Sequence, residues 1–207
     1  MYLKRKADAY LNAWKSDPNR SPLIIKGPRQ VGKTETIDYF AAHNYRSVVE
    51  INFVEEPKYR AITADGYGAD TIVRNISLID PAKKFIPGDT LIFFDEIQAH
   101  PDIVTALKFF KIDGKYDVIC SGSMLGISYK QIESNSVGYK TDYEMRSLDF
   151  EEFLWARGYD EAVIESMFTH LCDATPFSEV EMNVFSTAFM DYCVLGGMPA
   201  VVASHIR

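Results

Sequence analysis

The sequence has few cysteines and lacks any segment that would carry the chain into a membrane. Three cysteines occur among 207 residues, Cys120, Cys172 and Cys193, and no pair has CxxC spacing. This odd number favours neither a disulfide framework nor a zinc site, and it is typical of a reducing, cytoplasmic setting. Residues 1–20 are polar and amphipathic, so they do not indicate a signal peptide. No apolar run approaches the roughly 18 residues of a membrane span, so we expect no membrane partner.

The sequence also lacks an excess of positive charge, internal repeats and low-complexity segments. Its formal net charge of −7 argues against a strongly basic nucleic-acid groove over the whole surface. We interpret its one basic cluster, Lys4-Arg5-Lys6, as a solvated helix face. A hydrophobic content of 47% with 25% charged residues is ordinary for a globular chain with a proper core. The length fits one large domain, or one domain with a smaller appendage.

One segment has the spacing of a phosphate-binding loop, the Walker A pattern: Gly27-Pro28-Arg29-Gln30-Val31-Gly32-Lys33-Thr34. It follows an apolar run at 22–25, which predicts a buried strand, and precedes a predicted helix at 34–43. Its glycines let successive amides point inward as an anion nest, and the helix N-terminus adds further donors. We therefore predict that all eight residues bind ATP, with Lys33 on the β- and γ-phosphates and the Thr34 hydroxyl on Mg²⁺. The alternative is a basic surface turn.

A second segment, 90–96, reads Thr-Leu-Ile-Phe-Phe-Asp-Glu, which is the Walker B pattern. Four apolar residues followed by two acids predict a central parallel strand that delivers carboxylates at its C-terminal edge. We expect Asp95 to hold Mg²⁺ and Glu96 to orient and polarise an attacking water. The alternative for Glu96 is a helix cap or a solvated acid.

A third strand is predicted at 117–121, followed by Gly122 and Ser123. We expect it between the strand of the phosphate loop and the strand of Asp95, so that Ser121 or Ser123 senses the γ-phosphate. The alternative is an ordinary strand-to-loop turn. Gln98 either reports the nucleotide state or is a surface glutamine.

No residue is identified as an arginine finger, which would stabilise transition-state charge. The candidates also read as solvated or structural charges: Arg29, Arg74, Lys140 and Arg146. The four histidines show no ligand spacing and are interpreted as structural or exposed.

Periodicity and turn signals predict the remaining elements. The predicted helices are at 2–15, in pieces within 55–80 with 71–78 the clearest, from about 100 to 110, and at 160–173 and 178–195. Further strands are predicted at 47–53 and 143–148, with a loop at 126–142.

The C-terminal part begins with a helix that Asp149 and Glu152 start as a capping box and Gly158 ends. Residues 177–195 are apolar enough to be largely buried. Gly196-Gly197-Met198-Pro199 then breaks the helix. The final residues, 200–207, are helical or extended and lack a terminator, which suggests a piece of a longer protein, with a natural end as the alternative.

Together these motifs resemble the prokaryotic AAA-type P-loop ATPases that carry a C-terminal DUF4143 domain. The resemblance covers essentially the whole sequence and rests on these segments: 28–34, Asp95-Glu96-Ile97-Gln98, Ser121-Gly122-Ser123, 149–154 and Gly196-Gly197-Met198-Pro199. The family commonly has a valine-glycine-arginine or -lysine step, whereas this sequence has Val137-Gly138-Tyr139-Lys140. A sensing role of the family's basic residue would therefore carry over to this sequence only if Lys140 takes the place of that residue.

The resemblance implies an α/β P-loop NTPase fold of the additional-strand type, with a parallel sheet flanked by helices and Glu96 as the catalytic carboxylate. It implies an ATPase core at 1–158, a small helical region at 159–207, and a C-terminal domain that would begin shortly after Arg207.

We therefore predict Mg²⁺-dependent ATP hydrolysis by a nucleotide-driven switch or motor, which could form a homo-oligomer and act on a protein or DNA partner. One alternative is a DNA-associated or signalling module that uses ATP as a slow structural clamp. Another is a small-molecule kinase, although adjacent Asp95 and Glu96 fit water activation better.

Overall fold

The computed structural model describes residues 2–123 and 138–206. Its contacts divide the chain into two units. The sheet unit comprises Leu11–Arg29 and Lys33–Met145, and the helical unit comprises Met1–Tyr10, Gln30–Gly32 and Arg146–Arg207. Contacts thus group residues 146–158 with the later helices, while the boundary at residue 158 remains a prediction.

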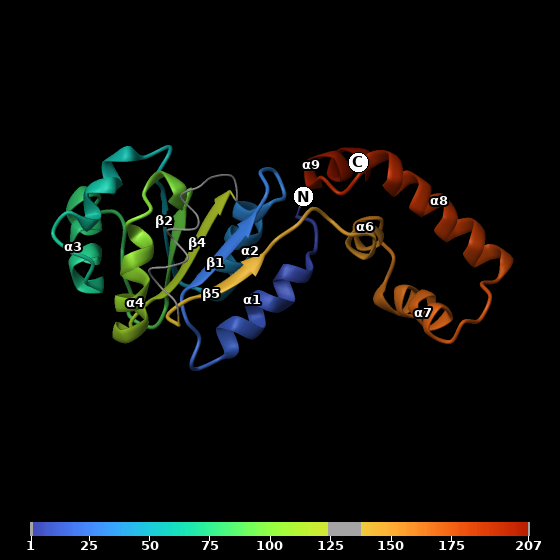
Figure 1. Cartoon of the computed structure of the whole chain (residues 1–207), viewed down its shortest axis with the longest axis horizontal. Coiled ribbons are helices and arrows are strands. Elements are labelled where there is room, and N and C mark those ends of the chain that lie inside the picture. Colours follow the sequence, from blue (N-terminus) through green and yellow to red (C-terminus); the bar gives the residue numbers. More distant parts are fainter. Residues whose placement is uncertain (1, 124–137, 207) are drawn as a thin grey trace. The chain divides into compact units, whose positions relative to one another are not determined.

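The sheet unit is built on five parallel strands (Figure 1). Their order across the sheet is β2 (Ser47–Asn52), β3 (Thr90–Asp95), β4 (Asp117–Ser123), β1 (Leu23–Gly27) and β5 (Thr141–Glu144). The predicted place of β4 between β1 and β3 is confirmed. Every residue of β3 is buried, because both faces of a central parallel strand are covered, and this explains its uninterrupted apolar run.

Helices cover the sheet, as predicted. They are α2 (Lys33–Asn44), the 3₁₀ turn η1 (Pro57–Thr63), α3 (Ala69–Ile79), the 3₁₀ turn η2 (Ile97–Ala99) and α4 (Ile103–Asp113). One face of the sheet packs its apolar side chains, including Ile24 and Phe94, with residues of α3 and α4. Alternate strand residues point to the opposite face. Ile25 and Phe93 on that face are fully buried, as is Ile37 of α2.

The predicted strand at 143–148 is wrong in its position, because β5 spans Thr141–Glu144. Among the described residues β5 pairs only with β1, and β1 ends at Gly27 where the phosphate loop begins. The last bond between the two segments runs from the Met145 N–H to the Lys26 carbonyl. Beyond it the backbone groups bond outside the sheet: the Arg146 carbonyl accepts a hydrogen bond from Arg5, and the Leu148 N–H donates to the Gly197 carbonyl. Most of the predicted loop, residues 126–137, lies outside the described residues.

The helix α1 spans Lys6–Ser16, so the prediction that it begins at residue 2 is wrong. The carboxylate of Asp8 accepts the Arg5 N–H at 2.8 Å, a bond that satisfies a backbone donor at the start of the helix. Leu3 and Arg5 precede α1 and are both buried. The interpretation of Lys4-Arg5-Lys6 as a solvated face is therefore wrong for Arg5, which is 5% exposed.

The helical unit contains α6 (Phe150–Ala156), α7 (Glu161–Cys172), α8 (Glu179–Leu195) and α9 (Pro199–Ile206). The predicted capping box of Asp149 and Glu152 is confirmed, and Ser178 and Glu181 form a second one before α8. No helix in the described part of the chain is both long and apolar enough to cross a membrane.

The prediction that residues 177–195 are largely buried is wrong. Within α8 the buried residues are Phe185 and Ala188, whereas Val180 is 71% and Val194 82% exposed. Apolar residues occur all round this helix, but its buried residues cluster with residues of α6 and α7 on one side only.

Gly197 lies in the connection between α8 and α9, and its backbone contacts the backbone of Leu148. Its carbonyl accepts the Leu148 N–H at 2.8 Å. A Cβ at this position would lie 2.1 Å from the Leu148 carbonyl oxygen, far inside van der Waals contact. The predicted break at 196–199 is confirmed, and the approach of two backbones explains why glycine occupies position 197.

Candidate functional site

The segment predicted to bind phosphates lies between β1, which ends at Gly27, and α2, which begins at Lys33. This is the predicted strand–loop–helix arrangement. The loop backbone is curled, because Gln30 has φ of 66° and Gly32 has φ of 88°. Positive φ is uncommon for a residue with a side chain, so Gln30 is held in a sparsely populated conformation.

Lys33 folds back over this loop. Its ammonium donates hydrogen bonds to the carbonyls of Gly27 at 3.0 Å and Pro28 at 2.7 Å. Burial lowers the pKa of Lys33, while the negative charges of Glu96 and Asp95 act in the opposite direction. The loop therefore presents a cation that already lies in the field of both predicted carboxylates.

Asp95 collects side-chain donors from α2 and from β2 and β4, the two strands that flank β3. The Thr34 hydroxyl lies 3.2 Å from Oδ2 of Asp95, and the Ser121 hydroxyl donates to Oδ1. Asp95 is 5% exposed, and Ser121 is fully buried. The two residues predicted to hold Mg²⁺, Thr34 and Asp95, are thus brought together, and both offer the oxygen ligands that Mg²⁺ prefers.

Asn52 joins this group and was not predicted from the sequence. Its amide nitrogen lies 3.5 Å from Oδ2 of Asp95, and its amide oxygen accepts the N–H groups of Val54 and Glu55. Asn52 is the last residue of β2 and is in register with Asp95, the last residue of β3. The signal that could have found it was a polar residue near the end of the strand predicted at 47–53.

Glu96 follows Asp95 in the left-handed conformation, with φ of 53° and ψ of 45°. It occupies the N-cap position of η2, but its side chain makes no capping hydrogen bond. Instead its carboxylate accepts a hydrogen bond from the Gln98 amide. The Gln98 amide oxygen is buried and has no partner among the described residues. The structure therefore does not support a capping role for the Glu96 side chain.

The two predicted sensor serines lie within β4, which continues to Ser123. The alternative of a strand-to-loop turn is therefore wrong for Ser121. The register pairs Ser123 with Gly27, the first residue of the phosphate loop. Ser121 binds Asp95, and Ser123 lies where the strand meets the loop.

The candidates for an arginine finger differ in where they lie. Arg29 and Arg146 are exposed. Arg74 is exposed beside Asp65, with 3.9 Å between Nη2 and Oδ2. The ammonium of Lys140 is bound to both carboxylate oxygens of Asp142, at the amino end of β5. The phosphate loop follows the carboxyl end of β1. Because β5 runs parallel to β1, Lys140, which precedes β5, lies at the amino ends of the strands, the edge of the sheet opposite the loop.

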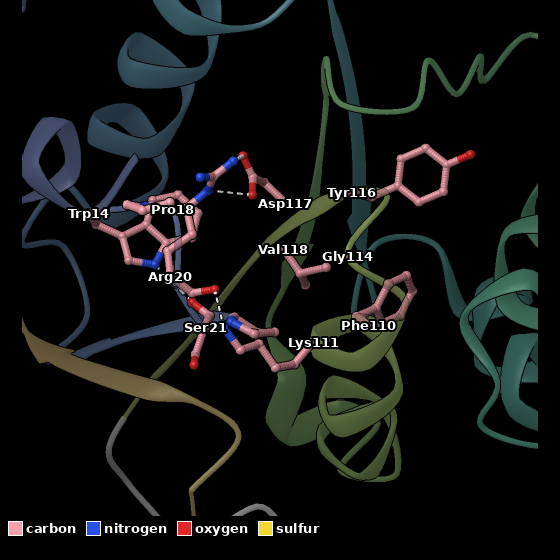
Figure 2. Close-up of a pocket in the computed structure, with 11 residues that line it drawn as sticks. Trp14, Pro18, Arg20, Ser21, Phe110, Lys111, Gly114, Tyr116, Asp117 and Val118 are labelled. Atoms are coloured by element: carbon pink, nitrogen blue, oxygen red, sulfur yellow. Dashed lines mark hydrogen bonds and ion pairs between the residues drawn. The ribbon is translucent and has the colours of Figure 1, made fainter. Parts of the chain in front are cut away.

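A small pocket also lies at that opposite edge (Figure 2). Its volume is about 130 Å³, and its lining includes Trp14, Ser21 and Tyr116. Arg20 binds both oxygens of Asp117 there, at 2.6 and 3.0 Å. Open α/β sheets bind ligands at the carboxyl ends of their strands, in pockets of about 300–1,000 Å³, so this cavity does not fit a nucleotide.

Two observations define the class of protein. The phosphate loop connects β1 to α2, and β4 separates β1 from the acid-bearing strand β3. This is the α/β architecture of the P-loop NTPases with an additional central strand.

Comparisons with known proteins assign the family. A family model described as an AAA domain matches residues 19–154, so the chain belongs to this family. It is an AAA-type P-loop ATPase core. No curated protein sequence matches it.

Solved structures with a similar arrangement include Caenorhabditis elegans PCH-2, with 11% identity and a TM-score of 0.44, over 86% of this chain and 50% of that chain. Another is the Drosophila ORC bound to DNA, with 14% identity and a TM-score of 0.47, over 78% of this chain and 47% of that chain. The chain thus spans about half the length of these two proteins.

Proposed function

We propose that this chain binds ATP with Mg²⁺ and hydrolyses the β–γ phosphoanhydride, and that it acts as a nucleotide-driven switch or motor. The observation that carries the proposal is the 3.2 Å approach of the Thr34 hydroxyl to the Asp95 carboxylate. It joins the phosphate loop to the acid-bearing strand and forms a pair of oxygen ligands suited to Mg²⁺.

Binding is assigned to residues 27–34. Their backbone amides and the N-terminus of α2 supply donors for phosphate oxygens, and Lys33 supplies a positive charge. Lys33 now donates to Gly27 and Pro28, so it would exchange these carbonyls for phosphate oxygens. Thr34 and Asp95 would hold Mg²⁺, which when bound neutralises charge on the phosphates.

Hydrolysis is assigned to Glu96. Its left-handed backbone costs of order 1–3 kcal/mol, and such strain is concentrated at functional sites. The strained turn leaves the carboxylate free of capping, beside Asp95 and bound to Gln98. A carboxylate in this position accepts a proton from an attacking water. Ser121 orients Asp95, and Ser123 senses the γ-phosphate from its place beside Gly27.

The test is Glu96→Gln, which keeps the side-chain volume and removes the base. We expect this variant to bind ATP with wild-type affinity and to release phosphate at least about a hundredfold more slowly, the usual contribution of a general base. Glu55→Gln, at an exposed glutamate of the turn after β2, is the matched control and should hydrolyse ATP normally.

Unchanged turnover in Glu96→Gln would remove the catalytic role. Tight ATP binding without measurable turnover in the wild-type chain would favour the slow structural clamp. Phosphate release without any added acceptor excludes the kinase.

The larger assembly is also a proposal. We infer from the sequence resemblance an ATPase core at 1–158, a helical region at 159–207, and a prokaryotic, cytoplasmic protein with a C-terminal DUF4143 domain. A homo-oligomer would let a neighbouring subunit supply the arginine finger, because Arg74 and Lys140 are paired with Asp65 and Asp142 and no residue of this chain is assigned as the finger. Turnover measured against protein concentration tests this, since activation in trans makes specific activity rise steeply.

A further inference from the structure

Arg5 is a buried arginine that touches the phosphate loop. Its side chain is 5% exposed, and three of its nitrogens find three different acceptors. Nε lies 3.1 Å from Oε1 of Glu152, Nη1 lies 2.8 Å from the Val31 carbonyl, and Nη2 lies 2.6 Å from the Arg146 carbonyl. All these residues belong to the helical unit, which includes residues 30–32 of the loop.

The bond to Val31 determines which way one loop peptide points. The described residues contain no cis peptide bonds, so the Val31 carbonyl and the Gly32 N–H point in opposite directions. With the carbonyl held by Arg5, the Gly32 N–H is directed away from the guanidinium. An anion nest needs its N–H groups on one side, and the bond to Arg5 fixes one of them.

Without that bond the peptide has freedom to turn over. Gly32 has φ of 88° and, as a glycine, adopts either sign of φ with little steric cost. A Cβ at Gly32 would come 3.7 Å from Nη1 of Arg5 and 3.6 Å from Pro199. The charged hydrogen bond from Arg5 therefore selects one of two accessible orientations of the 31–32 peptide.

The position of Arg5 itself depends on the start of α6. Oε1 of Glu152 also accepts the Lys6 N–H at 2.7 Å, and Oε2 accepts the Asp149 N–H as part of the capping box. Glu152 is 4% exposed, so its charge is compensated by these donors and by Arg5. A lysine at position 5 has one nitrogen and cannot reproduce the planar fork that reaches three acceptors.

We propose that Arg5 is a positioning residue for the phosphate loop, and that it couples nucleotide binding to the capped start of α6. The inference rests on the proposed function, since it assumes that residues 27–34 bind ATP. Coupling of this kind is reciprocal. If the oriented loop strengthens ATP binding by some free energy, bound ATP stabilises the start of α6 by the same amount.

The test compares Arg5→Lys with Arg20→Lys at the same temperature, after circular dichroism has shown both to be folded. Arg20 is the matched control, because its guanidinium also bonds a carboxylate, that of Asp117, which lies at the amino end of β4 and not at the phosphate loop. We expect Arg5→Lys to weaken Mg²⁺–ATP binding about tenfold in calorimetry, the effect of losing one charged hydrogen bond. Arg20→Lys should bind as the wild type does.

Two further measurements separate positioning from a loss of stability. A partly unfolded enzyme has fewer sites, which lowers the apparent kcat and leaves KM unchanged, whereas a misoriented loop raises KM. We expect a raised KM in Arg5→Lys. In hydrogen exchange, ATP should protect residues 2–8 and 146–156 together with 27–34 in the wild type, and only 27–34 in Arg5→Lys.

If Arg5→Lys does not fold, Glu152→Gln replaces it, because the amide oxygen still accepts hydrogen bonds while the charge is lost. We expect about threefold weaker ATP binding and loss of the spread of protection. Wild-type affinity in a folded variant, or protection confined to 27–34 in the wild type, overturns the inference and leaves the proposed function standing. Absence of any ATP binding by the wild type overturns both.

Discussion

The hydroxyl of Ser121 donates a hydrogen bond to Oδ1 of Asp95, between the neighbouring strands β4 and β3. Ser121 is fully buried, and the Glu96 N–H donates to the same oxygen at 2.9 Å. Asp95 is thereby held by two donors, which leaves Oδ2 directed to Thr34.

Ser121→Ala should therefore raise the Mg²⁺ requirement. Loss of one hydrogen bond of about 1 kcal/mol predicts that about fivefold more Mg²⁺ is needed for half-maximal ATP turnover. Ser123→Ala, two residues along the same strand, should lower turnover without this shift. A Mg²⁺ titration of phosphate release checks both, and identical half-saturation in Ser121→Ala and wild type would contradict the role of Ser121.

Lys33→Ala should weaken ATP binding by about tenfold to a hundredfold, because a charged donor to the phosphates is lost. The control is Lys111→Ala, since Lys111 also donates to two backbone carbonyls, those of Asn19 and Arg20. Calorimetry with Mg²⁺–ATP measures both. Wild-type affinity in Lys33→Ala would mean that the nucleotide binds elsewhere.

Gly197→Ala should lower the free energy of unfolding by about 2–3 kcal/mol, because its methyl group would overlap the Leu148 carbonyl. Gly68→Ala is the control. Gly68 has φ of −62°, and a Cβ there would lie 3.5 Å from the nearest atom, so the change should cost about 1 kcal/mol or less, the usual cost of alanine at the N-cap of a helix. Urea denaturation followed by circular dichroism gives both values, and equal stability of the two variants would refute the clash.

Acid should destabilise the fold through His100. This residue is buried against Phe53, and its Nε2 lies 3.0 Å from the Thr63 hydroxyl. Burial lowers the pKa of His100. The charge of Asp102 acts to raise this pKa, and the charge of Arg60 acts to lower it further. The native state then binds fewer protons than the unfolded state below about pH 6.5. The contribution of neutral His100 to the free energy of unfolding is therefore complete above that pH and is lost as the pH falls.

His100→Asn removes this titration and keeps a hydrogen-bonding side chain, so unfolding should depend less on pH between about 5 and 7. His43→Asn, at an exposed histidine, should keep the wild-type slope. Denaturant unfolding at several pH values checks this, and a slope unchanged by His100→Asn would exclude His100 as the source.

Local patterns predicted the sheet unit well. The apolar run of β3 had to be central because every one of its residues is apolar or small until Asp95, and the loop at 27–34 had to connect a strand to a helix. Asn52 was missed, because its role depends on register with Asp95 across two strands that are far apart in the sequence. The prediction for β5 failed because its length is set by where β1 ends.

The helical unit shows the same limit. Apolar composition predicted a buried α8, but composition does not say how many neighbours are present to cover a helix, and only one side of α8 is buried. The capping box that begins at Asp149 was predicted because its two partners lie three residues apart in the sequence. The box that begins at Ser178 has the same spacing but was not predicted.

The sequence by itself determined which residues the proposed site contains, since glycine, lysine, threonine and two acids at fixed spacing are what a triphosphate and its metal would need. Only the tertiary structure decided what holds that chemistry in place. Arg5 stands in a basic cluster that looked solvated, yet burial and three acceptors drawn from positions 31, 146 and 152 give it its place. A charge is assigned its partners by the packing of distant segments, and no local pattern contains that information.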